Sequence, residues 1–232
     1  ALRGRARPVS GAVVLLSGGL DSSTLLHAVA RDLGAKGVVA LTLCYGQKHA
    51  REIACAAAQA RAAGVSRHRI ADVAVLGALV AGASALTDPA VPVPDLAGLS
   101  AAQREQPSTY VPHRNLVFLS LAAAFAEAQG MHDVYYGAQR QDAYGYWDCT
   151  PAFADRLNAV LALNRREPVR VHAPFAELSK RDIVRLGLDL GVPYAETWSC
   201  YRGGDRPCGA CPACVERGAA FRSLGVPDPL AA

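Results

Sequence analysis

Short apolar runs alternate with longer helix-periodic stretches along most of this 232-residue chain. The apolar runs predict strands at 12–16, 37–44, 69–75, 133–137 and 169–175. The periodic stretches predict helices at 20–33, 47–63, 115–129, 151–164 and 179–190. Strands and helices that alternate in this way form open parallel sheets with helices on both faces. The sequence therefore predicts an α/β protein with such a sheet.

One long segment, 77–112, interrupts this alternation. Its prolines, at positions 89, 92, 94, 107 and 112, break any sustained periodicity. Loops of this length in compact domains usually have a function, so we expect 77–112 to be an active-site loop. Open parallel sheets bind ligands at the carboxyl ends of their strands. The polar segments 17–23, 45–49 and 138–149 each follow a predicted strand, so they should meet in one crevice there.

Composition and charge narrow the class of protein. The hydrophobic fraction of 51% excludes a disordered chain. The net charge of +4 is mild, so we expect small-molecule partners and no direct binding of nucleic acid. No uncharged apolar run is long enough for a membrane span. We interpret residues 2–8 as a frayed terminus rather than a signal peptide, and we expect a cytoplasmic protein with reduced thiols. A monomer and a homodimer both stay open.

The stretch "VVLLSGGLDSST", from Val13 to Thr24, leads from an apolar strand through a glycine pair into a helix. The glycines allow a tight turn that points backbone N–H groups inward, and the helix N-terminus adds further donors. With the serine hydroxyls, these groups form an anion cradle suited to phosphate. A plain turn with a helix cap is the alternative, although it needs fewer donors. The residues expected to bind the nucleotide are Leu16, Ser17, Gly18, Gly19, Leu20, Asp21, Ser22 and Ser23.

Four of the seven cysteines gather in one C-x7-C-x2-C-x2-C cluster near the end of the sequence: Cys200, Cys208, Cys211 and Cys214. In a reducing compartment such a cluster indicates a metal more often than disulfides. Four thiolates suit a tetrahedral zinc ion, which would be structural because no coordination position stays open. An iron–sulfur cluster is the competing interpretation.

The glycine-rich loop resembles the pyrophosphate-binding loop of the ATP pyrophosphatase (PP-loop) families. The resemblance implies a Rossmann-like fold of the adenine nucleotide alpha-hydrolase type. It also implies an enzyme that cleaves ATP to AMP and pyrophosphate and adenylates an oxygen of its substrate, with magnesium as a further cofactor. Asp21 is the residue expected to hold that ion or to orient the donors of the loop.

The loop and the cysteine cluster together resemble the 7-cyano-7-deazaguanine synthase family of the queuosine pathway. The motifs "YGQKH" (45–49), "YVPHRN" (110–115) and "GAQRQDAYGYWDCTPAF" (137–153) agree with that family, and the match spans 13–229. The sequence departs from the family at a few positions. His113 stands where glycine is usual, Trp147 where proline is usual, Thr150 where arginine is common and Cys44 where an acid is common.

The family resemblance implies a ligase that forms carbon–nitrogen bonds. Its members convert 7-carboxy-7-deazaguanine and ammonia to the nitrile with ATP, through an adenylated carboxylate and an adenylated amide. We expect residues 9–195 to form the PP-loop domain, with residues 196–232 as a zinc-binding region packed on it. Ammonia should come free or from a partner, because these 232 residues leave no room for a glutaminase domain.

Residues inside and outside the glycine-rich loop are assigned roles on the same basis. The expected catalytic residues are Asp21, Arg114 and Lys180. The expected substrate-binding residues are Tyr45, Gln47, Arg114, Asn115, Asp142, Tyr146 and Asp148. One carboxylate can accept both N–H groups of a guanine-like edge, and Asp148 is preferred over Asp142 because it matches the family's acid. Arg114 and Lys180 are also compatible with plain surface charges.

Three other functions stay open. A PP-loop tRNA thiolase would need a persulfide-carrying cysteine or an iron–sulfur cluster, together with a surface that binds RNA. Another adenylating amide ligase would share the loop and differ in its substrate. A non-catalytic nucleotide sensor would bind ATP without producing AMP.

Overall fold

The computed structural model describes residues 11–47 and 51–230. Its sheet consists of β1 (Ala12–Leu15), β2 (Val38–Cys44), β3 (Arg67–Asp72), β4 (Asp133–Tyr135) and β5 (Arg170–His172). The strands are all parallel, in the order β3-β2-β1-β4-β5. The predicted open parallel sheet is therefore confirmed. The order reverses direction at β1, so the chain leaves a crevice between β1 and β4 at their carboxyl ends.

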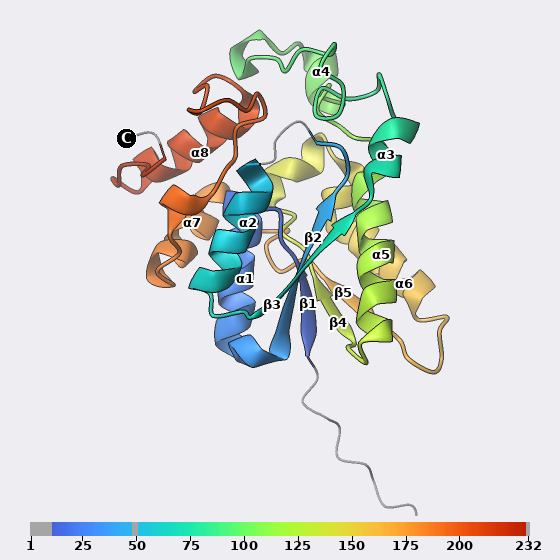
Figure 1. Ribbon diagram of the computed structural model, residues 1–232. Coiled ribbons are helices and arrows are strands. Elements are labelled where there is room, and N and C mark those ends of the chain that lie inside the picture. The colour runs from blue at the N-terminus through green and yellow to red at the C-terminus, as the bar shows by residue number, and fades with distance from the viewer. Residues whose placement is uncertain (1–10, 48–50, 231–232) are drawn as a thin grey trace, which may run out of the picture.

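Helices cover both faces of the sheet, as Figure 1 shows. One face carries α1 (Leu20–Leu33), α2 (Arg51–Ala62), α7 (Lys180–Asp189) and α8 (Pro212–Ser223). The other face carries α5 (Arg114–Ala128) and α6 (Pro151–Leu161). Alternate residues of one strand serve the two cores, because side chains alternate along a strand: Val14 packs in the first and Val13 in the second. None of the described helices is both long enough and apolar enough to cross a membrane.

The third strand and the segment after it differ from the sequence prediction. The expected strand at 69–75 is observed at Arg67–Asp72, and α3 (Ala74–Leu79) begins where it should have continued. The physical reason is Asp72, whose Oδ1 accepts a hydrogen bond from the N–H of Ala74 (2.8 Å) and turns the chain out of the sheet.

The segment 77–112 contains more structure than a plain loop. It holds η2 (Leu96–Gly98) and α4 (Ala101–Glu105). Ser100 and Gln103 form a capping box at the start of α4, with the N–H of Gln103 donating to Ser100 Oγ (3.3 Å). Four further single-turn helices lie elsewhere in the described chain: η1 (Ala35–Gly37), η3 (Arg140–Tyr144), η4 (Trp147–Cys149) and η5 (Tyr194–Glu196).

The C-terminal region packs directly on the helices that cover one face of the sheet. Ala220 and Phe221 of α8 lie in the core that α1 and α7 share. Arg217, also on α8, is 3% exposed. Its guanidinium donates to Asp228 through Nε (2.8 Å) and Nη2 (2.9 Å), and to Thr197 Oγ1 through Nη1 (2.7 Å). This buried fork ties α8 to the segments on either side of it.

We expect the substitution Asp228→Ala to lower the free energy of unfolding by about 3 kcal/mol or more, because it leaves the Arg217 charge buried without its carboxylate. Urea denaturation at equal metal content measures this change. Asp32→Ala is the matched control, since Asp32 pairs with Arg31 on the surface, and it should leave stability unchanged. Equal stability of Asp228→Ala and the native protein would contradict the account.

Candidate active site

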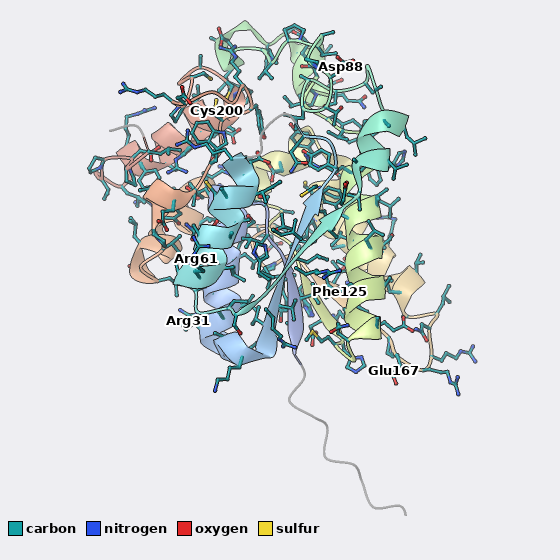
Figure 2. All side chains as sticks on the ribbon, viewed as in Figure 1. Arg31, Arg61, Asp88, Phe125, Glu167 and Cys200 are labelled. Atoms are coloured by element: carbon teal, nitrogen blue, oxygen red, sulfur yellow. The ribbon has the colours of Figure 1, made fainter. Side chains whose placement is uncertain are left out.

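A cavity of about 280 Å³ opens at the carboxyl ends of the strands. Segments far apart in the sequence meet around it: the glycine-rich loop, the ends of β2 and β4, the start of α5, and the C-terminal region. Figure 2 labels Cys200 and Asp88 at this end of the molecule, whereas Arg31 and Glu167 lie at the opposite end. The expected convergence of the three polar segments is thus observed for their described residues. Positions 48–50 of the second segment lie outside the described residues.

Most of the expected nucleotide-binding residues reach the cavity. Those that line it are Leu16, Ser17, Gly19, Leu20, Asp21 and Ser22. Gly18 and Ser23 are not among its lining residues. The hydroxyls of Ser17 and Ser22 lie 2.9 Å apart, and the N–H of Gly19 donates to Ser17 Oγ (3.3 Å). Gly19 precedes α1 without any side-chain cap, so no capping side chain occupies the N-terminal N–H groups of this helix, and such groups suit an anion.

Gly18 is the residue that lets the loop fold this tightly. Its φ is 81°, and a Cβ there would lie 2.3 Å from the carbonyl oxygen of Glu52 and 2.6 Å from the amide nitrogen of Ala56, both on α2. Gly19 differs, because its φ is −78° and its Cβ would first meet Ser17 Oγ at 3.3 Å. Of these two positions, it is position 18 that requires glycine, because of its backbone conformation and its close neighbours.

We therefore expect Gly18→Ala to lower the free energy of unfolding by about 2 kcal/mol or more and to weaken ATP binding at least tenfold, on the order of the strain and overpacking terms combined. Gly19→Ala is the control, and it should retain nearly native stability. Thermal denaturation and ATP titration measure both variants. If the two alanine variants were equally stable, the steric explanation would be wrong.

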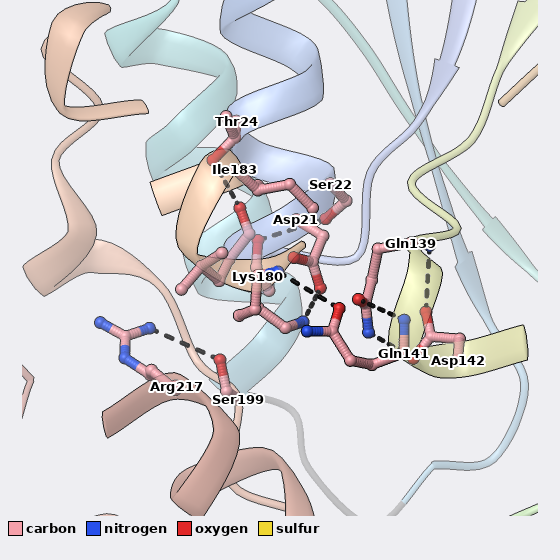
Figure 3. Close-up of polar contacts among 12 residues, drawn as sticks. Asp21, Ser22, Thr24, Gln139, Gln141, Asp142, Lys180, Ile183, Ser199 and Arg217 are labelled. Carbon is pink, nitrogen blue, oxygen red and sulfur yellow. Dashed lines mark hydrogen bonds and ion pairs between the residues drawn. The ribbon is translucent and has the colours of Figure 1, made fainter. Parts of the chain in front are cut away.

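Asp21 and Lys180 form a largely buried ion pair at the mouth of the loop. Lys180 Nζ lies 2.5 Å from Asp21 Oδ2, and the two side chains are 14% and 22% exposed. Figure 3 shows Lys180 reaching from the start of α7 to Asp21 at the start of α1. Burial alone would lower the pKa of Lys180, but Asp21 and then Asp142 raise it above its ordinary value, so the amine stays charged. Lys180 is therefore not the solvated surface lysine that the sequence left open.

The second oxygen of Asp21 has no hydrogen-bond partner among the described residues, although it is buried. A buried carboxylate oxygen without a partner is costly unless a cation or donor satisfies it. Because the first oxygen binds Lys180, the free one is the atom suited to a hard divalent ion. Asp21 thus fits the magnesium role expected of it.

Arg114 begins α5 and lines the cavity opposite the glycine-rich loop. Its Nη1 donates to the Tyr45 hydroxyl (3.2 Å), and its guanidinium lies 5.7 Å from the centre of the Tyr45 ring. Gln47 holds that tyrosine by accepting from its backbone N–H through Oε1 (2.8 Å). Glu52, which sequence reasoning did not select, also lines the cavity. Burial raises the pKa of Glu52 to about 7, against the opposing charge of Arg114.

The two candidate aspartates occupy different places. Asp142 lines the cavity, and its carboxylate accepts from Gln139 through the side-chain Nε2 (2.9 Å) and the backbone N–H (3.3 Å). Asp148 is 2% exposed and is not among the lining residues. Its Oδ2 accepts from the backbone N–H of Asn115 (3.1 Å), so it fixes the first turn of α5. In this structure Asp142 thus lies at the cavity and Asp148 lies behind the first turn of α5, so Asp142 is the carboxylate placed to contact a ligand there.

The departures from the family pattern lie outside the cavity lining. His113 has φ 54°, the left-handed region in which glycine is favoured, and it packs edge-on against Trp147 with ring centroids 5.5 Å apart. Trp147 in turn donates through Nε1 to the hydroxyl of Tyr110 (2.8 Å). Thr150 caps α6 by accepting from the N–H of Phe153 (3.2 Å). None of these three departures is among the lining residues, and neither is Cys44.

Several cavity residues were given no role by the sequence analysis. They are Glu52, Tyr136, Trp198, Ser199, Tyr201, Ala213, Glu216 and Arg217. Most belong to the region 196–232, which the sequence assigned to the metal alone. Two contacts hold the start of this region beside the glycine-rich loop. The backbone N–H of Trp198 donates to the Gly18 carbonyl (3.0 Å), and the Arg51 guanidinium lies 4.1 Å from the centre of the Trp198 indole ring.

The four clustered cysteines form one compact set of thiols. The Sγ atoms of Cys200, Cys208, Cys211 and Cys214 all lie within 4.8 Å of one another. A tetrahedral zinc ion with Zn–S bonds of about 2.3 Å requires sulfurs about 3.8 Å apart, and the Sγ atoms of Cys208 and Cys214 are 3.9 Å apart. The thiols therefore fit a four-coordinate metal. Cys211 immediately precedes α8, so the cluster fixes the start of the helix that carries Glu216 and Arg217 to the cavity.

The parallel sheet, with the glycine-rich loop directly after β1, is a fold of the PP-loop class. A solved glutamine-dependent NAD+ synthetase from Acinetobacter baumannii, in complex with ADP, superimposes with a TM-score of 0.50 at 18% identity, over 78% of this chain and 29% of that one. The family described as "Queuosine biosynthesis protein QueC" matches residues 11–225, and the chain belongs to this family.

Individual relatives agree with the family match. A protein of Anaeromyxobacter sp. named 7-cyano-7-deazaguanine synthase is 50% identical over 233 residues, which cover 96% of this chain and 96% of the relative. A protein of Azoarcus sp. with the same name is 46% identical over 225 residues, covering 94% and 95% of the two chains. The resemblance read from the motifs is thereby confirmed along nearly the whole chain.

Proposed function

We propose that the protein is a 7-cyano-7-deazaguanine synthase, a ligase that forms carbon–nitrogen bonds. It would convert 7-carboxy-7-deazaguanine and ammonia to the nitrile at the expense of ATP. The single observation that supports this best is the arrangement of the cavity: the glycine-rich loop, the Asp21–Lys180 pair and Asp142 line the same space. The name of a relative that is 50% identical to it supplies the product, 7-cyano-7-deazaguanine.

In the first step the substrate carboxylate attacks the α-phosphorus of ATP and pyrophosphate leaves. The N–H groups of the glycine-rich loop and the Lys180 amine would hold the negative charge on the departing phosphates. Asp21 would hold a magnesium ion through its free oxygen, and that ion would neutralise phosphate charge. Arg114 would orient the carboxylate, because its guanidinium matches two oxygens at once.

Ammonia then attacks the acyl-adenylate carbon, AMP leaves, and an amide remains. A second ATP adenylates the amide oxygen. Loss of both protons from the nitrogen and of AMP from the carbon then gives the nitrile. In this scheme the protein contributes mainly positioning and exclusion of water, which protects both adenylates from hydrolysis. The Asp142 carboxylate would accept the N–H groups of the deazaguanine ring, with Asn115, Tyr45, Gln47 and Tyr146 shaping the rest of the substrate pocket.

The cysteine cluster would hold a structural zinc ion. Four thiolates occupy every position of a tetrahedral zinc, so no substrate step is assigned to it. The tRNA thiolase alternative is not favoured, because the relatives carry the name of the synthase. We further propose a cytoplasmic enzyme without nucleic-acid or membrane partners, and leave a homodimer as one possible assembly.

The test is a reaction with purified protein, ATP, magnesium, ammonium and 7-carboxy-7-deazaguanine, in which AMP and the product mass are followed together. We expect AMP and the nitrile, and no AMP above background without the deazaguanine. AMP without nitrile would reject this substrate while keeping an adenylating enzyme. No AMP from folded, metal-loaded protein would reject the enzyme and favour a nucleotide sensor.

A further inference from the structure

Tyr136 has a buried hydroxyl that nothing in the described chain satisfies. The residue directly follows β4, at the edge of the crevice, and its side chain is 4% exposed. Its hydroxyl oxygen has no hydrogen-bond partner among the described residues, yet the side chain lines the cavity. Phenylalanine would fill the same apolar surroundings without burying a polar atom, so a hydroxyl here indicates a partner that arrives with a ligand.

The backbone of Tyr136 is held in place, so the ring has little freedom to search for another partner. Its N–H donates to the carbonyl of His172, the last residue of β5 (3.1 Å), which extends the pairing of β4 with β5 by one residue. The ring packs in the core under α5 and α6 together with Val134 and Cys149. Because side chains alternate along a strand, the preceding Tyr135 points to the other face, where it stacks on His172 with ring centroids 4.6 Å apart.

The groups around the hydroxyl define what it can bind. Burial raises the pKa of Tyr136, and Cys149, Asp148 and Asp142 raise it further, so the phenol keeps its proton at all physiological pH values. The hydroxyl is therefore a neutral hydrogen-bond donor. Asp142, which lines the same cavity, is an acceptor. A donor and an acceptor that belong to the lining of one cavity match a ring edge that shows a carbonyl oxygen beside an N–H group, as a guanine-type lactam does.

We propose that Tyr136 is a specificity-determining residue whose hydroxyl donates to the ring carbonyl oxygen of the substrate base, beside the N–H groups that Asp142 accepts. This inference rests on the proposed function, since it takes the deazaguanine ring as ligand. It explains how the site would reject a base with an amino group in place of the carbonyl. Such a base would bring a second donor to the Tyr136 hydroxyl and would not satisfy its proton.

The test compares Tyr136→Phe with Tyr135→Phe, a matched loss of one hydroxyl from the neighbouring residue, which does not line the cavity. Calorimetry gives the Kd for 7-carboxy-7-deazaguanine and for its analogue with an amino group in place of the ring carbonyl. Tyr136→Phe should weaken the natural base about 10- to 100-fold, leave the analogue unchanged, and leave the KM for ATP unchanged. Tyr135→Phe should change none of these values.

The melting temperature of the ligand-free protein distinguishes a structural role of the Tyr136 hydroxyl from a role in binding the base. Because the Tyr136 hydroxyl is unsatisfied without ligand, Tyr136→Phe should not lower it. A lower melting temperature with an unchanged Kd would overturn the inference, and so would equal weakening of base and ATP. If the native protein converts the carboxylate to the nitrile while Tyr136→Phe binds it equally well, the inference fails alone. If the native protein neither binds nor converts it, the proposed function fails and the inference with it.

Discussion

Replacing Lys180 by methionine is expected to lower kcat/KM for ATP about 100- to 1000-fold, the range measured when one preorganised electrostatic group is removed from an active site. Methionine keeps much of the side-chain volume, so the packing at the start of α7 changes little. The substitution removes the positive charge of the Lys180 amine, whose Nζ lies 2.5 Å from Asp21 Oδ2 beside the glycine-rich loop. The rate of pyrophosphate release measures the effect.

Arg181→Met is the control for this prediction, because Arg181 is the next residue along the same helix and is exposed. It should react at the native rate. Circular dichroism should show the same helix content for both variants, since Ser179 and Asp182, which form the capping box of α7, are untouched. A Lys180→Met enzyme with native kcat/KM would remove Lys180 from the phosphate site.

Removing one cysteine of the cluster is expected to have the largest effect on stability. Structural zinc in zinc-finger peptides binds with an apparent free energy of about 10–16 kcal/mol, so Cys211→Ala should lower the free energy of unfolding by about 5 kcal/mol or more. The loss should also reach ATP binding. The backbone N–H of Trp198 donates to the Gly18 carbonyl, and α8, which begins at the cluster, carries three residues of the cavity wall.

Metal analysis, thermal denaturation and ATP titration together check this prediction. The native protein should contain one zinc per chain and be colourless, whereas Cys211→Ala should have lost the metal. Cys44→Ala is the control, since Cys44 lies outside the cluster, and it should keep both metal and stability. A stable, zinc-free Cys211→Ala protein that still binds ATP would show that the cluster does not support the site. A brown native protein would point to iron and sulfur instead.

Much of the fold could be predicted because local signals and global packing agree. The strand at 12–16, the glycine pair and the helix at 20–33 are recognisable from residue type alone, and the structure places β1 and α1 at nearly the same residues. The edge strand β3 was misplaced for a physical reason. Its side chains are mostly exposed or half-buried, so it lacks the apolar pattern that marks the buried strands, and Asp72 ends it early.

The site was predictable only where its residues belong to contiguous motifs. Asp21 and Arg114 stand in such motifs. Tyr136 reaches the cavity because it follows the end of β4, and Glu52 reaches it because of how α2 packs. No local spacing of residues encodes either placement. Asp142 lines the cavity, whereas Asp148 binds the first turn of α5. The sequence could not separate the two, because that difference depends on a tertiary contact.

The most direct test of the central claim, adenylation of the substrate oxygen, is to follow the carboxylate oxygens themselves. The substrate is prepared with both carboxylate oxygens as ¹⁸O and converted with ATP and ammonium. We predict two AMP molecules per nitrile, each carrying one ¹⁸O atom, and unlabelled pyrophosphate. This follows because each step breaks a carbon–oxygen bond and leaves that oxygen on the adenylate phosphorus. Unlabelled AMP, or label in inorganic phosphate with ADP as the coproduct, would contradict the account.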